Sequence, residues 1–337
     1  MKKALSLSLV LLMVLAVFGC QAQPPRPAAS AAPAATAAPA ATAAASDVKY
    51  AVLLKPVSNE YWASMQKGIE DWAAQNNVTV DVYAAESEEN LQGQLSQLED
   101  ICKKGYAGIA VAPLSPVNLV SGIVMANKAG IPVIDADEAV NFEELKNNGG
   151  SVIGQVTTDN TIVGKNAGEF IIKAIGGSGK VAIIEGAAGN ATSLNRTTGA
   201  KNAFSAANGI ELVSSQPADW DRVKALDVAA NLLQTNPDLK AIYCANDTMA
   251  LGAVQAVINA NKQGQCIVVG TDGISGAIDS IKNGELTATV AQDPAGIGVR
   301  CMELLVQAVK DGNKGDPNAE VKVEYIDSKL ITKDNAQ

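Results

Sequence analysis

The sequence predicts an α/β protein made of two doubly wound parallel sheets. Short runs of apolar, often β-branched residues alternate with longer amphipathic stretches from residue 47 onward. The short runs are continuously apolar, which is typical of strands that helices bury on both faces. The runs form two successive series, and residues 47–337 number 291, enough for two domains of about 150 residues each.

The first series predicts five strands with helices between them. The segment after the first run has helical periodicity, because Trp62, Met65 and Ile69 fall three or four residues apart along one stripe. The same alternation continues to about residue 156. The predicted strands are 50–54, 78–83, 108–111, 132–134 and 152–156.

The second series repeats this pattern and ends in a further helix and strand. The segment after residue 291 is predicted to be a helix that ends before the turn-rich residues 311–315, and residues 321–325 are strand-like. Two such series indicate two sheets, each with helices on both faces. The predicted strands of the second series are 180–184, 211–215, 241–244, 267–270 and 286–291.

The first 46 residues are predicted to be an export signal and a tether. Residues 1–19 carry two lysines, a short apolar run and small residues, as secretory signal peptides do. The run has about fifteen apolar residues, fewer than the ~20 that span a bilayer, so a membrane-spanning anchor is the weaker alternative. Residues 17–20 resemble a bacterial lipobox, in which Cys20 becomes the lipidated first residue of the mature chain.

Residues 20–46 are predicted to be a disordered tether. Apart from Cys20 they are almost wholly Ala, Pro, Gln, Thr and Ser, which cannot bury enough apolar surface to offset the entropy of ordering. Prolines spread through the segment oppose the alternative of an Ala-rich helix. Lipid at Cys20 would hold the protein at the cell envelope, in the periplasm or on the outer face of a membrane.

Composition excludes several classes of function. Histidine is absent, which removes His-based triads, imidazole general bases and His-ligated zinc. The formal net charge of −9, without any basic run, argues against nucleic acid as a partner. Residues 176–180 resemble part of a phosphate-binding loop, but a predicted strand follows them instead of preceding them. We expect no cofactor and no metal site.

The remaining cysteines leave the disulfide question open. None forms a CxxC pair, and Cys244 lies inside an apolar run, where a buried free thiol is common. An exported chain can nevertheless oxidise its thiols. If Cys20 carries lipid, the remaining cysteines are Cys102, Cys244, Cys266 and Cys301.

Polar and aromatic side chains follow many of the predicted strands. In doubly wound sheets, ligands bind beyond the carboxyl ends of the strands, where loops and helix N-termini converge. The residues at these ends supply carboxylates, amides, a lysine, an arginine and two indoles. The candidate binding residues are Lys55, Asn59, Tyr61, Trp62, Asp137, Arg196, Trp220, Asn246, Asp272 and Gln292.

Some of these positions have a purely structural alternative. Polar residues that precede helices serve as N-caps, each worth about 1 kcal/mol. Trp62 can belong wholly to the apolar stripe of its helix, and the acidic pair at residues 88–89 is predicted to be solvated charge on a helix face. The residues that precede predicted helices are Asn59, Asp159, Asp221, Asn246 and Asp247.

The candidate set suits a neutral sugar or polyol. Hydroxyl groups both donate and accept hydrogen bonds, so their site needs carboxylate and amide oxygens together with Arg, Lys and amide nitrogens. Flat aromatic side chains pack against the weakly apolar faces of a sugar ring. A phosphate site would need glycine-rich backbone nests and net positive charge, and the carboxylates argue against it.

Four strings of residues in the second half of the chain form a recognisable pattern. They read SQPADWDR at 215–222, ANDTMA at 245–250, VVGTDG at 268–273 and TVAQ at 289–292. From about residue 48 the chain resembles the periplasmic sugar-binding proteins of ABC transporters, of the ribose/galactose-binding type.

Within that family the chain is more similar to members that bind D-allose than to members that bind ribose. A ribose-binding member is expected to have Asn in place of Ala112 and Arg in place of Glu138. The chain departs from the family at Glu60, where Pro is common, and at Tyr61, where Phe is usual. The allose-like strings are residues 54–55, 112–115, 137–138 and 241–244.

The resemblance implies the type I periplasmic binding protein fold, in which a hinge joins two lobes. It implies interdomain crossings near residues 157–160, 292–293 and 321–324. The expected N-terminal lobe is 47–158 plus 293–322, and the expected C-terminal lobe is 159–292 plus 323–337.

The resemblance also implies a function. A monomeric, non-enzymatic binding protein would capture a monosaccharide by hinge closure and deliver it to an ABC permease. We expect a D-allose-like hexose, with ribose or another aldose as alternatives. A co-receptor for chemotaxis or for a sensor kinase could use the same sugar site. A glycosidase is disfavoured because its carboxylates would lie across a mobile cleft.

Overall fold

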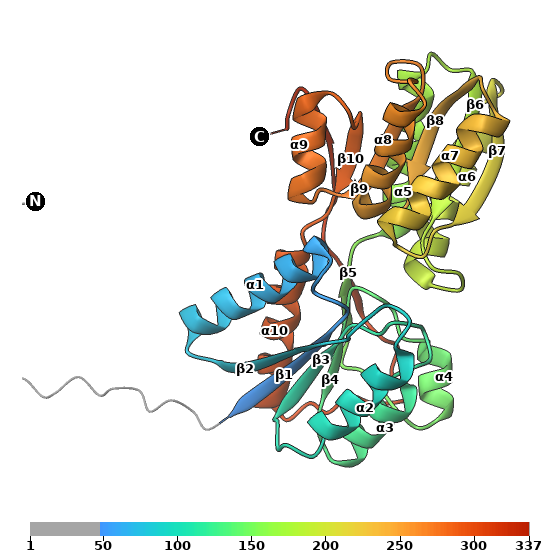
Figure 1. Ribbon diagram of the computed structural model, residues 1–337. Helices are drawn as coiled ribbons and strands as arrows, with labels where there is room; N and C mark the ends of the chain where they lie inside the picture. The colour runs from blue at the N-terminus through green and yellow to red at the C-terminus, as the bar shows by residue number, and fades with distance from the viewer. Residues whose placement is uncertain (1–47, 337) are drawn as a thin grey trace, which may run out of the picture. The chain divides into compact units, whose positions relative to one another are not determined.

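The computed structural model describes residues 48–336 of the chain (Figure 1). The predicted signal peptide, the lipidation site Cys20 and the tether lie outside these residues. Within them, strands and helices alternate and form two six-stranded sheets, so the predicted fold class is confirmed. No helix between residues 48 and 336 is both long enough and apolar enough to cross a membrane.

The first lobe contains one sheet with helices on both faces. Its strands are β1 (Lys49–Leu54), β2 (Thr79–Ala84), β3 (Gly108–Val111), β4 (Val133–Ala136), β5 (Gln155–Thr157) and β11 (Val323–Tyr325). Their order is β11–β5–β4–β3–β1–β2, and all neighbours are parallel. Val52 of β1 packs on one face and Leu53 on the other, as expected for a strand buried on both sides.

Five helices cover this first sheet. Val52 lies in the apolar cluster that faces α1 and α10, whereas Leu53 lies in the cluster that faces the other three helices. The helices on the first face are α1 (Glu60–Asn76) and α10 (Pro294–Asp311), and those on the second face are α2 (Leu91–Ile101), α3 (Val120–Lys128) and α4 (Phe142–Asn147).

The second lobe repeats the arrangement. Its strands are β6 (Gly179–Glu185), β7 (Ile210–Pro217), β8 (Leu239–Cys244), β9 (Ile267–Asp272), β10 (Ala288–Ala291) and β12 (Lys329–Thr332). Their order is β12–β10–β9–β8–β6–β7, and the edge strand β12 is antiparallel to β10. The helices on one face are α5 (Asn160–Ala174) and α6 (Ala191–Ala206), and those on the other are α7 (Arg222–Thr235), α8 (Asp247–Asn259) and α9 (Ser275–Asn283).

The chain passes from one sheet to the other three times, after β5, after β10 and after β11. The predicted third crossing at 321–324 is wrong, as is the lobe boundary between 322 and 323. Residues Val323–Tyr325 pair with β5 in the first sheet, and an ion pair between Arg300 on α10 and Glu324 (2.6 Å) holds them there. The crossing therefore lies between Tyr325 and Lys329.

The four cysteines of the described residues are free and buried. Burial raises the pKa of the Cys102 thiol to about 11 and that of Cys266 to about 12. Thiols that stay protonated are poor nucleophiles, so these side chains act as apolar packing.

Two glycines let α5 and α6 pack backbone to backbone. A Cβ at Gly164 would lie 1.9 Å from the backbone oxygen of Arg196, and one at Gly199 would lie 2.1 Å from that of Thr161. Neither position tolerates a side chain without moving a helix. This close contact fixes the position of Arg196, which belongs to the candidate site.

Candidate functional site

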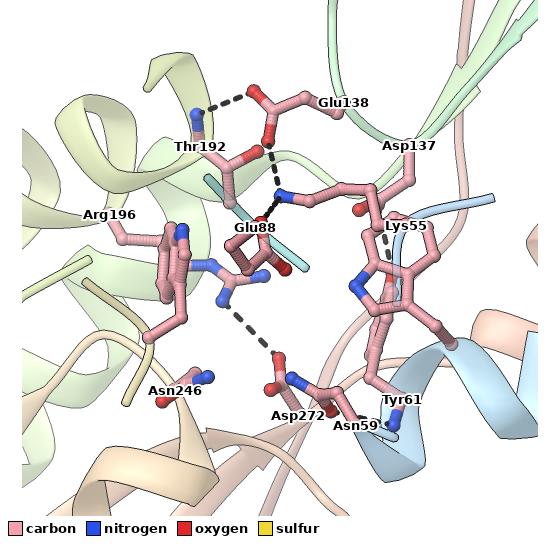
Figure 2. A pocket seen from close by; sticks show the side chains of 12 residues that line it. Lys55, Asn59, Tyr61, Glu88, Asp137, Glu138, Thr192, Arg196, Asn246 and Asp272 are labelled. Carbon is pink, nitrogen blue, oxygen red and sulfur yellow. Dashed lines mark hydrogen bonds and ion pairs between the residues drawn. The ribbon is translucent and has the colours of Figure 1, made fainter. Parts of the chain in front are cut away.

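Polar and aromatic residues from both lobes line one pocket at the carboxyl ends of the strands (Figure 2). Nine of the ten predicted binding residues lie there, the exception being Gln292. The first lobe contributes Lys55, Asn59, Tyr61, Trp62, Glu88, Asp137 and Glu138, and the second contributes Thr192, Arg196, Trp220, Asn246 and Asp272.

The start of α1 presents three of these side chains. Asn59 is the N-cap of α1, and its side-chain oxygen accepts a hydrogen bond from the backbone nitrogen of Tyr61 at 3.0 Å, so the capping alternative is confirmed while the residue also faces the pocket. Tyr61 and Trp62 lie edge to face, with ring centroids 5.0 Å apart. Trp62 belongs both to the apolar core and to the pocket wall.

Lys55 follows β1 and is held by acids. Its ammonium lies 3.0 Å from Glu88 Oε2 and 3.9 Å from Glu138 Oε2. It also lies 5.6 Å from the ring centroid of Trp62 and 5.9 Å from that of Trp220, within cation–π range. Burial opposes the charged form, but attraction to Glu88 and Glu138 outweighs it and raises the pKa of Lys55. Lys55 is therefore a charged donor within reach of both indoles.

Asp137 is anchored through its backbone and its side chain. It has a left-handed φ of 65°, and its backbone oxygen accepts hydrogen bonds from Thr157 Oγ1 (2.7 Å) and Gln155 Nε2 (3.3 Å). Its Oδ1 accepts a hydrogen bond from the Tyr61 hydroxyl at 2.9 Å. Burial raises the pKa of Asp137 to about 6, although the charge of Arg196 acts in the opposite direction.

Arg196 of α6 organises the side of the pocket that belongs to the second lobe. Its Nε donates to Asn160 Oδ1 at 2.8 Å, and its Nη1 donates to the backbone oxygen of Ala245 at 2.7 Å and to Asp272 Oδ1 at 3.3 Å. Burial raises the pKa of Asp272 to about 6 against the attraction of Arg196. Gln292 lies outside the pocket lining, but its Nε2 donates to Asp272 Oδ1 at 2.7 Å. Gln292 thus positions Asp272.

Trp220 lies in a strained turn. Asp219 and Trp220 have φ of 53° and 65°, a left-handed conformation that costs non-glycine residues of the order of 1–3 kcal/mol each. Gly186 makes room for the indole, because a Cβ there would lie 2.1 Å from a ring carbon of Trp220. Strain that the surrounding fold maintains is typical of functional positions.

Of the four other residues predicted to cap helices, three are caps and one is not. Asp159, Asp221 and Asn246 each accept hydrogen bonds at the start of the helix that follows. Asp247 is not a cap but the first residue of α8, and Asn246 is the cap. The buried Asp247 carboxylate accepts hydrogen bonds from the backbone nitrogens of Gly273 (2.7 Å) and Ile274 (3.1 Å), so it shapes the turn after Asp272.

Two acids of the first lobe accept hydrogen bonds from helix N-termini of the second lobe. Glu138 accepts from Asn190 Nδ2 at 2.7 Å and from the backbone nitrogen of Thr192 at 3.4 Å, at the start of α6. Glu60 accepts from the backbone nitrogen of Ser275 at 3.1 Å and from its Oγ at 2.5 Å. The N-cap of α9, Ile274, offers no side-chain hydrogen bond, so Glu60 supplies that acceptor.

Three pocket residues were missed from the sequence. The interpretation of Glu88 as solvated charge is wrong, because it lies in the loop between β2 and α2 and pairs with Lys55. Its place after a strand was the signal that could have found it. Glu138 directly follows Asp137 and could have been found by the same rule. Thr192 lies in the first turn of α6, and its residue type carried no signal.

Comparisons with known proteins agree with this geometry. A family model described as the periplasmic binding protein domain matches residues 50–314. The D-allose-binding periplasmic protein of Escherichia coli (strain K12) is 52% identical over 285 residues, which cover 84% of this chain and 92% of that protein. The ribose import binding protein of Salmonella typhimurium is 33% identical over 284 residues, which cover 84% of this chain and 90% of that protein.

A solved structure shows the same fold. It is an ABC transporter periplasmic solute binding protein from Actinobacillus succinogenes 130z with bound D-allose, at a TM-score of 0.80 and 33% identity, covering 86% of this chain and 99% of that chain. The region matched by the family model includes every residue that lines the pocket. The chain therefore belongs to the periplasmic binding protein family.

Proposed function

We propose that this chain is an extracytoplasmic binding protein that captures a neutral monosaccharide, D-allose or a closely related hexose, in the pocket between its lobes. The observation that supports this most is that Trp62 and Trp220 share one pocket with buried donors and acceptors from both sheets. Trp220 Nε1 is buried and has no hydrogen-bond partner within residues 48–336, so it can donate to a ligand hydroxyl.

Charge favours a neutral sugar over an acidic one. Lys55 and Arg196 bring two positive charges, whereas the pocket contains four carboxylates, those of Glu88, Asp137, Glu138 and Asp272. A sugar phosphate or a uronate would add negative charge to this excess of acid, with little solvent to screen the repulsion. Hydroxyl groups can instead donate to the carboxylates and accept from the two cations.

Similarity supports D-allose among the neutral sugars. The relative with 52% identity is described as D-allose-binding, and the solved neighbour contains D-allose. Thermal-shift and calorimetric titrations with D-allose, D-ribose, D-glucose and D-glucuronate test the proposal. A ligand at a hundred times its Kd adds about 2.7 kcal/mol to the unfolding free energy. We expect D-allose to stabilise most and glucuronate not at all, and stabilisation by glucuronate alone would contradict the proposal.

The division of the site between lobes supports capture by closure. A ligand that contacts both lobes binds the closed state better than an open one and shifts the population toward it. The hydrogen bonds from Ser275 in the second lobe to Glu60 in the first would exist only in the closed state. A loaded, closed chain is the form that we propose is delivered to an ABC permease.

Glu60→Ala is expected to weaken D-allose binding about threefold to tenfold, mainly through faster dissociation. The variant removes two hydrogen bonds of the closed state, each worth about 0.5 kcal/mol, the low end of the usual range, because both partners are exposed. Stopped-flow tryptophan fluorescence measures the dissociation rate. Glu70→Ala, which removes an exposed acid further along α1, serves as the control and should dissociate as wild type does. Equal rates in the Glu60 and Glu70 variants would contradict closure through this contact.

Anchoring through Cys20 is proposed from the sequence string at residues 17–20 alone. We expect Cys20→Ser to appear in the soluble fraction of the producing bacteria and to lose metabolic labelling with fatty acid, while it retains sugar binding. Fractionation followed by immunoblotting measures this. Continued membrane association of the Ser variant would argue for an anchor other than lipid at Cys20.

A further inference from the structure

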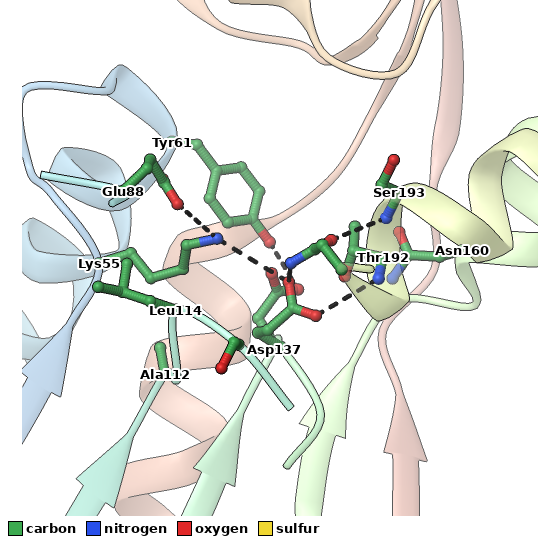
Figure 3. Close-up of polar contacts among 12 residues, drawn as sticks. Lys55, Tyr61, Glu88, Ala112, Leu114, Asp137, Asn160, Thr192 and Ser193 are labelled. Carbon is green, nitrogen blue, oxygen red and sulfur yellow. Dashed lines mark hydrogen bonds and ion pairs between the residues drawn. The ribbon is translucent and has the colours of Figure 1, made fainter. Parts of the chain in front are cut away.

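The hydroxyl of Tyr61 makes a hydrogen bond that orients another pocket residue. It donates to Asp137 Oδ1 at 2.9 Å inside the pocket (Figure 3). Both residues are 4% exposed. Burial, followed by the charge of Asp137, raises the pKa of Tyr61 well above its usual value, so the phenol stays protonated and donates to the ionised Asp137.

The phenol completes the anchoring of Asp137. The backbone of Asp137 is already fixed by Thr157 and Gln155, which both donate to its carbonyl oxygen. With the backbone fixed, the side chain of Asp137 can still rotate, and the Tyr61 hydroxyl restricts this rotation by its hydrogen bond to Oδ1. Oδ2 accepts no hydrogen bond from residues 48–336, although Asp137 lines the pocket. Oδ2 is therefore the open acceptor.

We propose that Tyr61 is a positioning residue that sets specificity, because it commits one oxygen of Asp137 and leaves the other to accept a single ligand hydroxyl. The inference rests on the proposed function of the pocket. With Phe at this position, both carboxylate oxygens could accept from two adjacent hydroxyls of one sugar. With Tyr, only Oδ2 of Asp137 is free, so the carboxylate accepts one hydroxyl and from one direction.

The same hydrogen bond stabilises the ionised form of Asp137. Burial raises the pKa of this carboxyl to about 6, while Arg196, Tyr61 and Lys55 act to lower it and Glu138 acts to raise it. Without the phenol, one of the groups that favour the ionised form is lost, so the pKa of Asp137 moves further upward. The charged or titratable groups that face Asp137 are Lys55 after β1, Tyr61 on α1, Asp135 on β4, Glu138 in its own loop, Arg196 on α6, Asp272 on β9 and Cys301 on α10.

Carboxyl NMR of the sugar-free protein tests the coupling directly. The protein is labelled with ¹³C at aspartate side chains, and the Asp137 resonance is assigned with Asp137→Asn. In Tyr61→Phe the titration midpoint of Asp137 is expected to move upward. The control Tyr83→Phe removes a phenol hydroxyl that is hydrogen-bonded to Tyr106 outside the pocket, and it should leave the titration midpoint of Asp137 unchanged. An unchanged midpoint in Tyr61→Phe would overturn the proposal.

Calorimetric titrations with D-allose and its C3 epimer D-glucose, between pH 5 and pH 8.5, test the consequence for binding. At pH 6 we expect Tyr61→Phe to bind D-allose about fivefold more weakly than wild type. Near pH 8.5, where Asp137 is ionised in both proteins, the difference should be smaller but should persist, because the carboxylate of the variant is no longer held by the phenol. The ratio of the two sugar affinities should fall. A loss that is the same at every pH, with an unchanged ratio, would indicate packing alone and overturn the proposal. If wild type binds neither sugar while the NMR midpoint still moves, the proposed function fails and the coupling stands.

Discussion

Replacing Trp220 with alanine is expected to weaken D-allose binding by at least about thirtyfold, which corresponds to ~2 kcal/mol. The indole lines the pocket, is 9% exposed and lies in the space that Gly186 leaves open. Without the indole, the sugar loses a flat apolar surface and the Nε1 donor, and water enters the space that the side chain filled. Isothermal titration calorimetry at pH 7.5 measures the change.

A matched variant separates this effect from general destabilisation. Trp72→Ala removes a half-buried indole from the outer part of α1, away from the pocket lining. It should lower the melting temperature but keep the affinity of wild type. If Trp220→Ala bound D-allose within about twofold of wild type, the placement of the sugar ring against this indole would be wrong.

Acidification is expected to weaken sugar binding about tenfold for each of two carboxylates between pH 7.5 and pH 5. Burial raises the pKa of Asp137 and of Asp272 to about 6 in the empty pocket. We expect the ionised carboxylates to be the acceptors of the sugar hydroxyls, so below pH 6 binding first has to remove a proton from each. At one pH unit below the pKa this costs about 1.4 kcal/mol per group, and both together give up to about a hundredfold.

The stability of the empty protein has the opposite dependence. Because these two pKa values lie above the ordinary value of about 3.9, the folded state binds more protons than the unfolded state between pH 4 and pH 6. These groups therefore make the unfolding free energy fall as the pH rises through that window. Denaturant titrations of the empty protein at several pH values measure this change in unfolding free energy. For sugar binding, Asp137→Asn should halve the change in the logarithm of Kd between pH 7.5 and pH 5, because one of the two titrating carboxylates is removed. A Kd that is equal at pH 5 and pH 7.5 would show that neither carboxylate is an ionised acceptor.

The fold could be predicted from the sequence because strands that are buried on both faces are continuously apolar. Residues such as Val52 and Leu53 must both be apolar when helices cover both sides of a strand, so the central strands appear as continuous runs. Edge strands carry less of this signal. The strand β12 is nowhere fully buried and was not predicted, and the end of the first sheet at β11 was assigned to the wrong lobe.

The candidate site was accessible because parallel strands bring their carboxyl ends to one edge. Arg196 and Asp272 are 76 residues apart and still meet at 3.3 Å. The rule identifies which residues gather but not which of them faces the ligand. Gln292 follows β10 as expected, yet it contacts Asp272 instead of the pocket. Contacts between lobes, such as that of Glu60 with Ser275, depend on how the two sheets face each other and have no local signature.

A crystal structure of the chain with D-allose tests the central claim most directly. We predict one sugar ring in the pocket, with its faces against Trp62 and Trp220 and its hydroxyls within hydrogen-bonding distance of Asp137, Arg196 and Asp272. Sugar density at any other place, with these side chains contacting only solvent, would contradict the account.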